Sequence, residues 1–442
     1  MNLVINGRLI TRDTEGKGYY EHGAVAYEGS KIVEVGEESA LRRKYPDAHC
    51  IDAKGGVIMP ALINAHTHIY SALARGLSIV GNNPTNFYEV LDGTWWAIDR
   101  KLMMDGTRAS ATALYMDSIK QGVTTIFDHH ASYGEIPGTL HTIAEESKRL
   151  GLRSCLCYEV SDRDGEEKCL QAIQENADFI TECEKNKDPM LAAMFGGHAL
   201  FTISDKTFDR MVEANNGRTG YHIHVSEGMN DVYDSLQNYG RRPVQRLQDH
   251  GILGPKTILG HCIHVNTAEM EIIKETGTMV VNNPESNMGN AIGICPVIQL
   301  YKRGILLGMG TDAYTNDMLE SLKVALCSQR SQNCLPNVGW CEVTDMLFKN
   351  NAKIGEKYFP DTLGVLKPGA AADIIVMDYK PFTPFSDENI DGHMIFGMTG
   401  RQCQTTIAAG KTLMLDRQLV GIDEEAENAL SLIHISEPTR RS

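Results

Sequence analysis

The segment VIMPALINAHTH at residues 57–68 has the pattern of a buried β-strand that ends in two histidines. Seven further apolar runs follow, and most of the eight carry His, Glu, Asp or Asn at or near their carboxyl end. The seven runs cover residues 123–130, 153–159, 190–199, 220–227, 257–262, 278–284 and 305–312. Longer helical patterns separate them, as in a series of βα units. Eight such units favour an α/β fold with a closed (β/α)8 TIM barrel over an open doubly wound sheet, and polar strand ends then surround an active site.

Both ends of the chain have a different pattern from the middle. Residues 1–55 form short alternating runs broken by glycine, and sheet patterning returns after Gly364. We expect the two ends to form one small discontinuous β-sandwich domain, from residues 1–55 and from residues 366–430 with a C-terminal helix. The barrel is then expected over residues 56–365. The last stretch, SLIHISEPTRRS at 431–442, interrupts an acidic helical pattern and is predicted to be a foreign tail.

Composition excludes several classes of partner. The chain has 442 residues, with 42 Lys and Arg against 57 Asp and Glu, and a formal net charge of -15. An acidic chain repels phosphate backbones, so we expect no nucleic-acid partner. We see no secretory signal and no apolar run of membrane-spanning length, and we expect no membrane partner. The 11 cysteines are scattered without paired spacing, which is typical of reduced thiols and predicts a cytoplasmic protein.

Four residues on three distant strands predict a metal site. His66 and His68 lie two apart, so both imidazoles point to one face of their strand. His224 ends the fifth run, and Asp312 ends the eighth, where an ionised carboxylate needs a partner. Each signal is weak alone, but in a barrel the three strand ends meet around one ion. His222 shares a strand face with His224, and we expect it to pack beside the site or to support it.

Two further residues suit acid-base chemistry beside such an ion. Glu227 closes the fifth run three residues after His224, and His261 ends the sixth run. Both are candidates for catalysis, because carboxylates and imidazoles next to a metal can move protons. The structural alternative is a helix N-cap or a salt bridge for Asp312 and a satisfied structural histidine for His261.

Substrate contacts are harder to predict. Arg75 is suited to clamp a carbonyl or a carboxylate, or else to pair with a helix carboxylate. Trp95, in the long stretch between Gly81 and Gly106, is suited to stacking on a planar ring or to packing. His198 ends the fourth run and is a pocket candidate. His129 and His130 point to opposite faces of the second strand, and we select His130.

With these motifs in place, the chain resembles the amidohydrolase superfamily, in its aminohydrolase (deaminase and chlorohydrolase) branch. The resemblance is carried by PALINAHTH (60–68), LARG (73–76), HVSE (224–227), GHC (260–262), NPESN (283–287), GTD (310–312) and VLKPGAAADIIVMD (365–378). Within this branch, the sequence looks most like the SsnA-type aminohydrolases. Their likeness is carried by WWAIDR (95–100), DHHAS (128–132), YEVSDRDG (158–165) and HMIFGM (393–398).

The resemblance implies one divalent ion held by His66, His68, His224 and Asp312, with a proton-handling trio of Glu227, His261 and Asp312. Zinc is the expected ion and iron the alternative, because three histidines and an aspartate suit several divalent metals. Binuclear relatives bridge two ions with a carboxylated Lys or a Glu on the fourth strand. The run MLAAMFGGHA carries neither, so a second ion is not expected. A homodimer is what the resemblance implies for assembly.

These features predict hydrolytic deamination of a small nitrogen heterocycle, purine-like and for example of the guanine type. In this mechanism the ion lowers the pKa of water toward about 7, Asp312 accepts a proton, Glu227 protonates a ring nitrogen and His261 stabilises charge. Hydrolysis of a cyclic amide and dehalogenation of a chloro-heterocycle are the alternatives within enzymes. A catalytically silent metal-binding scaffold is the alternative outside them, and it is disfavoured because the trio is present.

Overall fold

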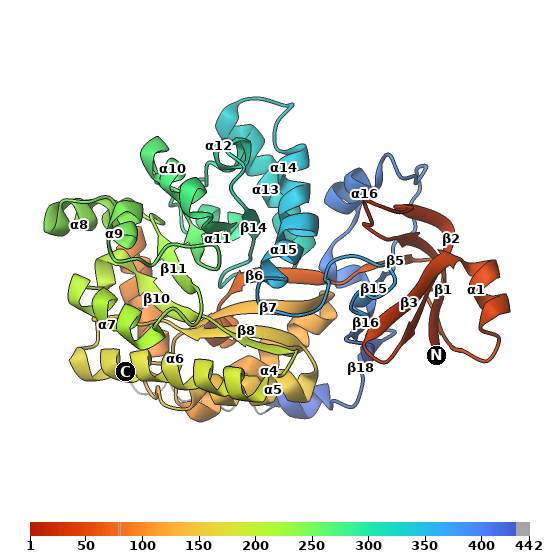
Figure 1. The fold of residues 1–442 in the computed structure, drawn as a ribbon, viewed down its shortest axis with the longest axis horizontal. Helices are drawn as coiled ribbons and strands as arrows, with labels where there is room; N and C mark the ends of the chain where they lie inside the picture. The colour runs from red at the N-terminus through yellow and green to blue at the C-terminus, as the bar shows by residue number, and fades with distance from the viewer. Residues whose placement is uncertain (78, 80, 430–442) are drawn as a thin grey trace.

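A computed structural model describes residues 1–77, 79 and 81–429 of the chain, and the predicted foreign tail at 431–442 lies outside these residues. The molecule has two parts (Figure 1): a barrel with its helices, and a sheet built from both ends of the chain. Among the described residues, no helix combines the length and apolar content needed to cross a bilayer.

The barrel consists of parallel strands in two hydrogen-bonded sets. The first set runs in the order β6 (Leu62–Thr67), β7 (Val123–His130), β8 (Arg153–Tyr158), β9 (Leu191–Ala193). The second runs β10 (Phe195–Ala199), β11 (Tyr221–Val225), β12 (Ile258–His261), β13 (Met279–Asn282), β14 (Leu307–Met309). Single bridges join the sets, between Val160 and Gly197 on one side and between Thr67 and Asp312 on the other. The closed ring confirms the predicted (β/α)8 barrel, with the fourth run forming two short strands, β9 and β10.

Helices and short turns surround the strands, as expected for βα units. Before β11 they are η1 (Ile69–Ala74), α2 (Phe87–Val90), η2 (Leu91–Trp95), α3 (Trp96–Asp99), α4 (Met104–Lys120), α5 (Thr139–Leu150), α6 (Glu166–Asn186), η3 (Leu200–Thr202) and α7 (Asp205–Asn215). After β11 they are α8 (Met229–Tyr239), α9 (Pro243–Asp249), α10 (Thr267–Thr276), α11 (Pro284–Gly289), α12 (Val297–Lys302), α13 (Met318–Asn333), α14 (Trp340–Asp345), η4 (Met346–Asn350) and α15 (Asn351–Gly355).

Local sequence sets several of these helix ends. Asn266 and Glu269 form a reciprocal capping box at the start of α10, and the carboxylate of Asp317 accepts two backbone N–H groups at the start of α13. Such caps satisfy amides that have no partner within the helix. Gly151 ends α5 with a φ of 85°, a left-handed conformation that glycine adopts without strain.

The two chain ends form one mixed sheet of nine strands, which lie side by side at one end of the molecule in Figure 1. Its path is β18 (Gln418–Leu419), β17 (Lys411–Leu415), β16 (Cys403–Ala408), β15 (Ile374–Met377), β5 (Val57–Pro60), β1 (Asn2–Ile10), β2 (Tyr19–Glu28) and β3 (Lys31–Glu37), with β4 (His49–Asp52) paired to β1. Helices α1 (Glu38–Lys44) and α16 (Ile390–Gly397) and the turn η5 (Gly400–Gln402) accompany it. This separate sheet is consistent with the predicted discontinuous β-sandwich.

The run 57–68, predicted as one strand, is in fact two. Its first half, β5, pairs with β1 and β15 in the terminal sheet, and its second half, β6, enters the barrel. The change of partner falls at Ala61, whose N–H donates to Asp373 while the next residue, Leu62, donates to Gly122. Both halves are buried and apolar, so the sequence pattern could not reveal the exchange of partners.

A buried ion cluster joins the two parts of the molecule. The guanidinium of Arg153, on β8, is fully buried and lies 2.5 Å from a carboxylate oxygen of Asp373 and 3.3 Å from one of Asp361. Asp373 also accepts the backbone N–H of Ala409 in the terminal sheet. The carboxylate therefore ties a barrel strand to the sheet formed by the chain ends.

We expect Asp373→Ala to destabilise the protein by about 3 kcal/mol, because it leaves a buried guanidinium without its closest partner. Thermal unfolding followed by circular dichroism measures the effect. Glu21→Ala, which removes an exposed ion pair with Arg8, is the control and should change Tm little. Equal shifts in the two variants would contradict the structural role of Asp373.

Candidate metal centre and pocket

Closure of the barrel brings the predicted metal ligands together. The backbone N–H groups of Thr311 and Asp312 both donate to the carbonyl of His66, at 3.0 Å. The segment that follows β14 is thus hydrogen-bonded to β6 beside the two histidines of that strand. Ring nitrogens of His66, His68 and His224 lie within 4.8 Å of one another, and so do the ligand atoms of His66, His261 and Asp312.

The histidines of this cluster have the supports that metal ligands need. Nδ1 of His68 donates to the carbonyl of His129 at 2.6 Å, and Nδ1 of His66 lies 2.8 Å from Nε2 of His222. Nε2 of His66 is buried and has no hydrogen-bond partner. A ring held through one nitrogen, with the other bare and turned to a shared centre, is the usual arrangement of a metal-binding histidine. The donor set therefore fits a divalent ion, and the expected support by His222 is present.

Burial keeps most of these imidazoles neutral, which is the form that binds metals. Burial, followed by repulsion from the neighbouring imidazoles, lowers the pKa of His66, His222 and His224 well below the usual value. Burial is the largest influence on His68 and disfavours its charge, but Asp312, Glu159 and the carbonyl of His129 together outweigh it and raise the pKa of His68 to about 9. For Asp312, burial is opposed by the charge of His68, which holds the pKa of that carboxyl well below its usual range.

The three predicted catalytic side chains meet at one point. Nε2 of His261 lies 3.6 Å from a carboxylate oxygen of Glu227 and 3.6 Å from one of Asp312. Nδ1 of His261 donates to the amide oxygen of Asn287 at 2.8 Å, so Nε2 is the nitrogen left for chemistry. Burial, together with repulsion from Asp312 and Asp231, raises the pKa of Glu227 well above its usual value. The buried carboxyl is therefore suited to donate a proton near neutral pH.

The backbone at these strand ends is unusual. His261 and Asp312 have φ values of 68° and 59°, and Ser226, next to Glu227, has a φ of 49°. These are left-handed conformations that side-chain-bearing residues rarely adopt, and they concentrate at functional sites because surrounding contacts must stabilise them. All three lie beside the same centre.

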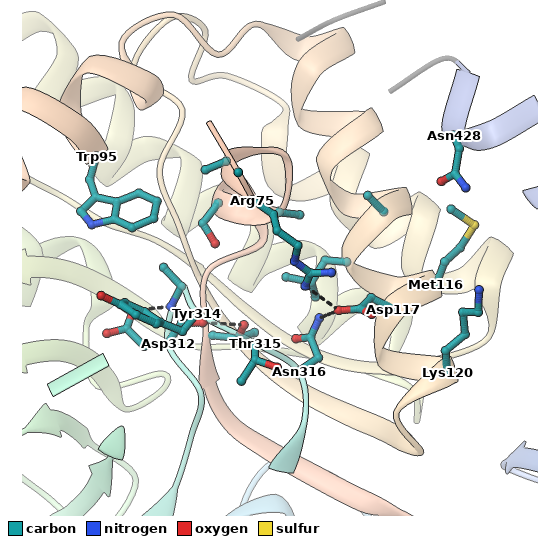
Figure 2. A pocket seen from close by; sticks show the side chains of 18 of the residues that line it. Arg75, Trp95, Met116, Asp117, Lys120, Asp312, Tyr314, Thr315, Asn316 and Asn428 are labelled. Atoms are coloured by element: carbon teal, nitrogen blue, oxygen red, sulfur yellow. Dashed lines mark hydrogen bonds and ion pairs between the residues drawn. The ribbon is translucent and has the colours of Figure 1, made fainter. Parts of the chain in front are cut away.

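Two neighbouring cavities adjoin the cluster. A narrow chamber of about 30 Å³ is lined by His68, His224, Glu227 and Asp312 and is covered by α2, η2 and α3. A wider cavity of about 490 Å³ opens beside it, and Trp95 and Tyr314 line both. In the view of Figure 2, Trp95 lies on one side and Tyr314 is drawn next to Asp312 on the other. Part of the long stretch between the first two barrel strands thus lines the chamber.

The predicted substrate-contacting residues divide into two groups. His198 and Trp95 line the narrow chamber. Arg75 lines only the wider cavity, where it is exposed and lies 2.9 Å from Asp117, which also accepts a hydrogen bond from Asn316 (Figure 2). Its carboxylate partner is the alternative that the sequence left open.

The choice between the adjacent histidines of β7 is reversed in the structure. His130 lines neither cavity, and its ring packs against Tyr70 and Tyr158. His129 instead turns toward the cluster, with its ring centroid 4.5 Å from that of His224. Strand alternation placed the two rings on opposite faces correctly, but it carried no information about which face is the inner one.

Sequence reasoning missed Glu159. It follows β8, is buried, lines the narrow chamber, and has ligand atoms close to those of His198 and His224. Its only sequence signal was its position at the end of the third apolar run. Tyr314, two residues after Asp312, was also missed, although its place after a strand end is typical of a pocket residue.

Comparison with known proteins agrees with this geometry. The sequence model of a protein family described as "Amidohydrolase family" matches residues 57–413. A second family model, for an imidazolonepropionase-like composite domain of bacteria, matches residues 23–48. A 5'-deoxyadenosine deaminase from Methanosarcina barkeri is 30% identical over 96% of this chain and 95% of its own length. A 5-methylthioadenosine/S-adenosylhomocysteine deaminase from Thermococcus sibiricus is 32% identical over 88% of both chains. These relatives are deaminases of the same branch, and the likeness to SsnA-type proteins stays a prediction.

A solved structure has the same fold. The crystal structure of an adenosine deaminase from Xanthomonas campestris with bound zinc superposes with a TM-score of 0.87. It is 22% identical, and the match covers 99% of this chain and 98% of that one.

We expect His222→Phe to weaken metal binding by about 10- to 100-fold, because it removes the hydrogen-bond partner of His66 Nδ1 while keeping a ring of similar size. Competition with a chromophoric chelator measures the affinity. His141→Gln, which changes an exposed histidine on α5, is the control and should leave the affinity unchanged. Equal affinity in all three proteins would show that His222 does not support the site.

Proposed function

This chain belongs to the amidohydrolase family, and we propose that within it the protein is a metal-dependent deaminase of adenine-type nucleosides. The enzyme class follows from the family and its deaminase relatives: a hydrolase that acts on carbon–nitrogen bonds other than peptide bonds, in cyclic amidines. The observation that carries the proposal is the meeting of Glu227, His261 and Asp312 beside a histidine cluster.

The metal-binding residues are His66, His68, His224 and Asp312. In such a site a divalent ion would lower the pKa of water to about 7 and so supply a nucleophile at neutral pH. Zinc is the proposed ion, because nitrogen-rich sets with one carboxylate suit it and because the similar adenosine deaminase structure has zinc bound.

The protein's own groups move the protons. Asp312, whose carboxyl stays ionised, accepts a proton from the attacking water. Glu227, protonated because of its raised pKa, donates to a ring nitrogen of the amidine and makes the adjacent carbon electrophilic. Nε2 of His261 lies between the two carboxyls and stabilises the charge that develops as water adds. The C–N bond then breaks, a proton passes to the leaving nitrogen, and ammonia departs.

The proposed substrate is an adenine-type nucleoside rather than the guanine-type ring first expected. The support comes from the relatives, which are deaminases of 5'-deoxyadenosine and of 5-methylthioadenosine and S-adenosylhomocysteine. A cyclic amide or a chloro-heterocycle is the alternative substrate, because the same water-activating groups serve those reactions.

We expect zinc-loaded protein to release ammonia from 5'-deoxyadenosine and 5-methylthioadenosine with at least about tenfold higher kcat/KM than from guanine. A coupled ammonia assay measures the rate, and mass spectrometry identifies the product. Ring opening or chloride release without ammonia would replace deamination by one of the alternatives.

Glu227→Gln is expected to keep its metal but to lose at least about 1,000-fold in kcat, because the amide cannot deliver a proton. Asp312→Asn should lower both metal content and rate, since that carboxylate has two roles. Elemental analysis and steady-state kinetics on the same samples separate the effects. Turnover of Glu227→Gln close to that of the native protein would remove Glu227 from the scheme.

A further inference from the structure

The segment NPESN (283–287) forms most of the short helix α11 beside the candidate site. Asn287 on this helix supports His261, because its amide oxygen accepts a hydrogen bond from Nδ1 of that ring. The residue before it, Ser286, is also buried and lines the narrow chamber. Nothing described so far gives Ser286 a role, although its hydroxyl lies at the centre of the site.

The two carboxylate oxygens of Asp312 face different partners. Oδ1 accepts the backbone N–H of Ala313 at 2.7 Å and lies 3.0 Å from Nε2 of His68. Oδ2 accepts the hydroxyl of Ser286 at 2.6 Å and lies 3.6 Å from Nε2 of His261. A backbone amide on one oxygen and a hydroxyl on the other thus fix the rotation of the carboxylate.

Hydrogen-bond donors line up behind Ser286. A serine hydroxyl has one hydrogen and an ionised carboxylate only accepts, so this hydrogen goes to Asp312. The atom of Asn290 that lies 3.1 Å from Oγ of Ser286 must then be a donor, which is Nδ2. The amide oxygen of Asn290 faces the other way and accepts the hydroxyl of Tyr314 at 3.2 Å. The donors of Tyr314, Asn290 and Ser286 therefore all point toward Asp312.

The outer end of this chain borders both cavities. Tyr314 lines the narrow chamber and the wider cavity, and its side chain is partly exposed. Its ring lies against the end of α11, where a Cβ on Gly289 would overlap both the ring and the hydroxyl. The absence of a side chain at Gly289 thus leaves room for the tyrosine hydroxyl to reach Asn290.

We propose that Ser286, Asn290 and Tyr314 are positioning residues that hold the Asp312 carboxylate in one orientation. Hydrogen bonds that all donate in the same direction polarise one another, so the outer links strengthen the one that reaches the carboxylate. The fixed orientation keeps Oδ1 turned to His68 and Oδ2 turned to His261, and small displacements of a reacting group reduce the rate strongly. This role rests on the proposed function, in which Asp312 binds the ion and accepts a proton.

Ser286→Ala is expected to lower kcat and zinc affinity by about 10- to 100-fold each, because the carboxylate can then rotate. KM should change less than about threefold, since Ser286 acts through Asp312 and not by holding the substrate. Ammonia release gives the kinetic constants, and competition with a chromophoric chelator gives the affinity. Ser321→Ala is the matched control and should behave as the native protein. The hydroxyl of Ser321 is also buried and donates to a carboxylate, that of Glu285, but neither residue is among those that line the two cavities.

Double variants distinguish a chain from separate contacts. Tyr314→Phe keeps the ring but removes the hydroxyl, and we expect a loss of about two- to threefold in kcat and in zinc affinity. Asn290→Ala removes the middle link and should cost at least as much. Added to Ser286→Ala, neither substitution should cause a further loss, because the chain is already broken at its inner end. Losses that multiply would overturn the chain and make Tyr314 an independent contact.

Ser286→Ala with kcat and zinc affinity within about twofold of the native values would also overturn the proposal. Native protein that binds zinc but releases no ammonia would refute the proposed function alone, because the zinc affinities of the same variants still test the chain. If Ser286→Ala does not fold, Asn290→Ala and Tyr314→Phe decide, since neither side chain is fully buried. Native zinc affinity and native turnover in both would contradict the positioning role.

Discussion

The site depends on the hydrogen bonds that close the barrel between its first and last strands. The carbonyl of His66 accepts the N–H groups of Thr311 and Asp312, so the backbone that carries two proposed ligand imidazoles is fixed to the backbone that carries the proposed ligand carboxylate. Their side chains come from residues almost 250 positions apart, and only a closed ring of strands brings them within reach of one ion. Without this closure, Asp312 would be a buried charge without a partner.

Closure also gathers bare imidazole nitrogens and carboxyl groups in the same buried space. Several neutral imidazoles point their bare nitrogens toward the same interior, and three carboxyl groups, Glu159, Glu227 and Asp312, line the same narrow chamber. The environments of these carboxyls differ. Glu227 has a raised pKa, whereas neighbouring imidazoles, joined at Glu159 by the guanidinium of Arg163, lower the pKa of Glu159 and Asp312 despite burial. That difference separates a group suited to donate a proton from two carboxyls that stay ionised.

Much of this arrangement could be predicted from the sequence, because the residues that end buried strands obey simple rules. The pairs in INAHTH and HVSE and the end of GTD follow from strand periodicity and the cost of burying charge. What could not be predicted was which of two equivalent options the fold adopts. Alternation cannot tell the inner face of β7 from the outer, so His129 and His130 were exchanged. Likewise, the apolar pattern of 57–68 could not show that β5 leaves the barrel for the terminal sheet.

The size of the chamber constrains how any ring-shaped substrate reaches the centre. About 30 Å³ accommodates one or two water molecules, far less than a planar heterocycle requires. The cover consists of short elements, α2, η2 and α3, whose side chains Phe87, Trp95 and Trp96 line the chamber. The barrel strands cannot separate without breaking their ladders, whereas these short helices can shift at the cost of local aromatic contacts such as that between Trp95 and Tyr70. A bound ring therefore needs either part of the wider cavity or a displacement of this cover, and a cover closed over the ring would exclude water.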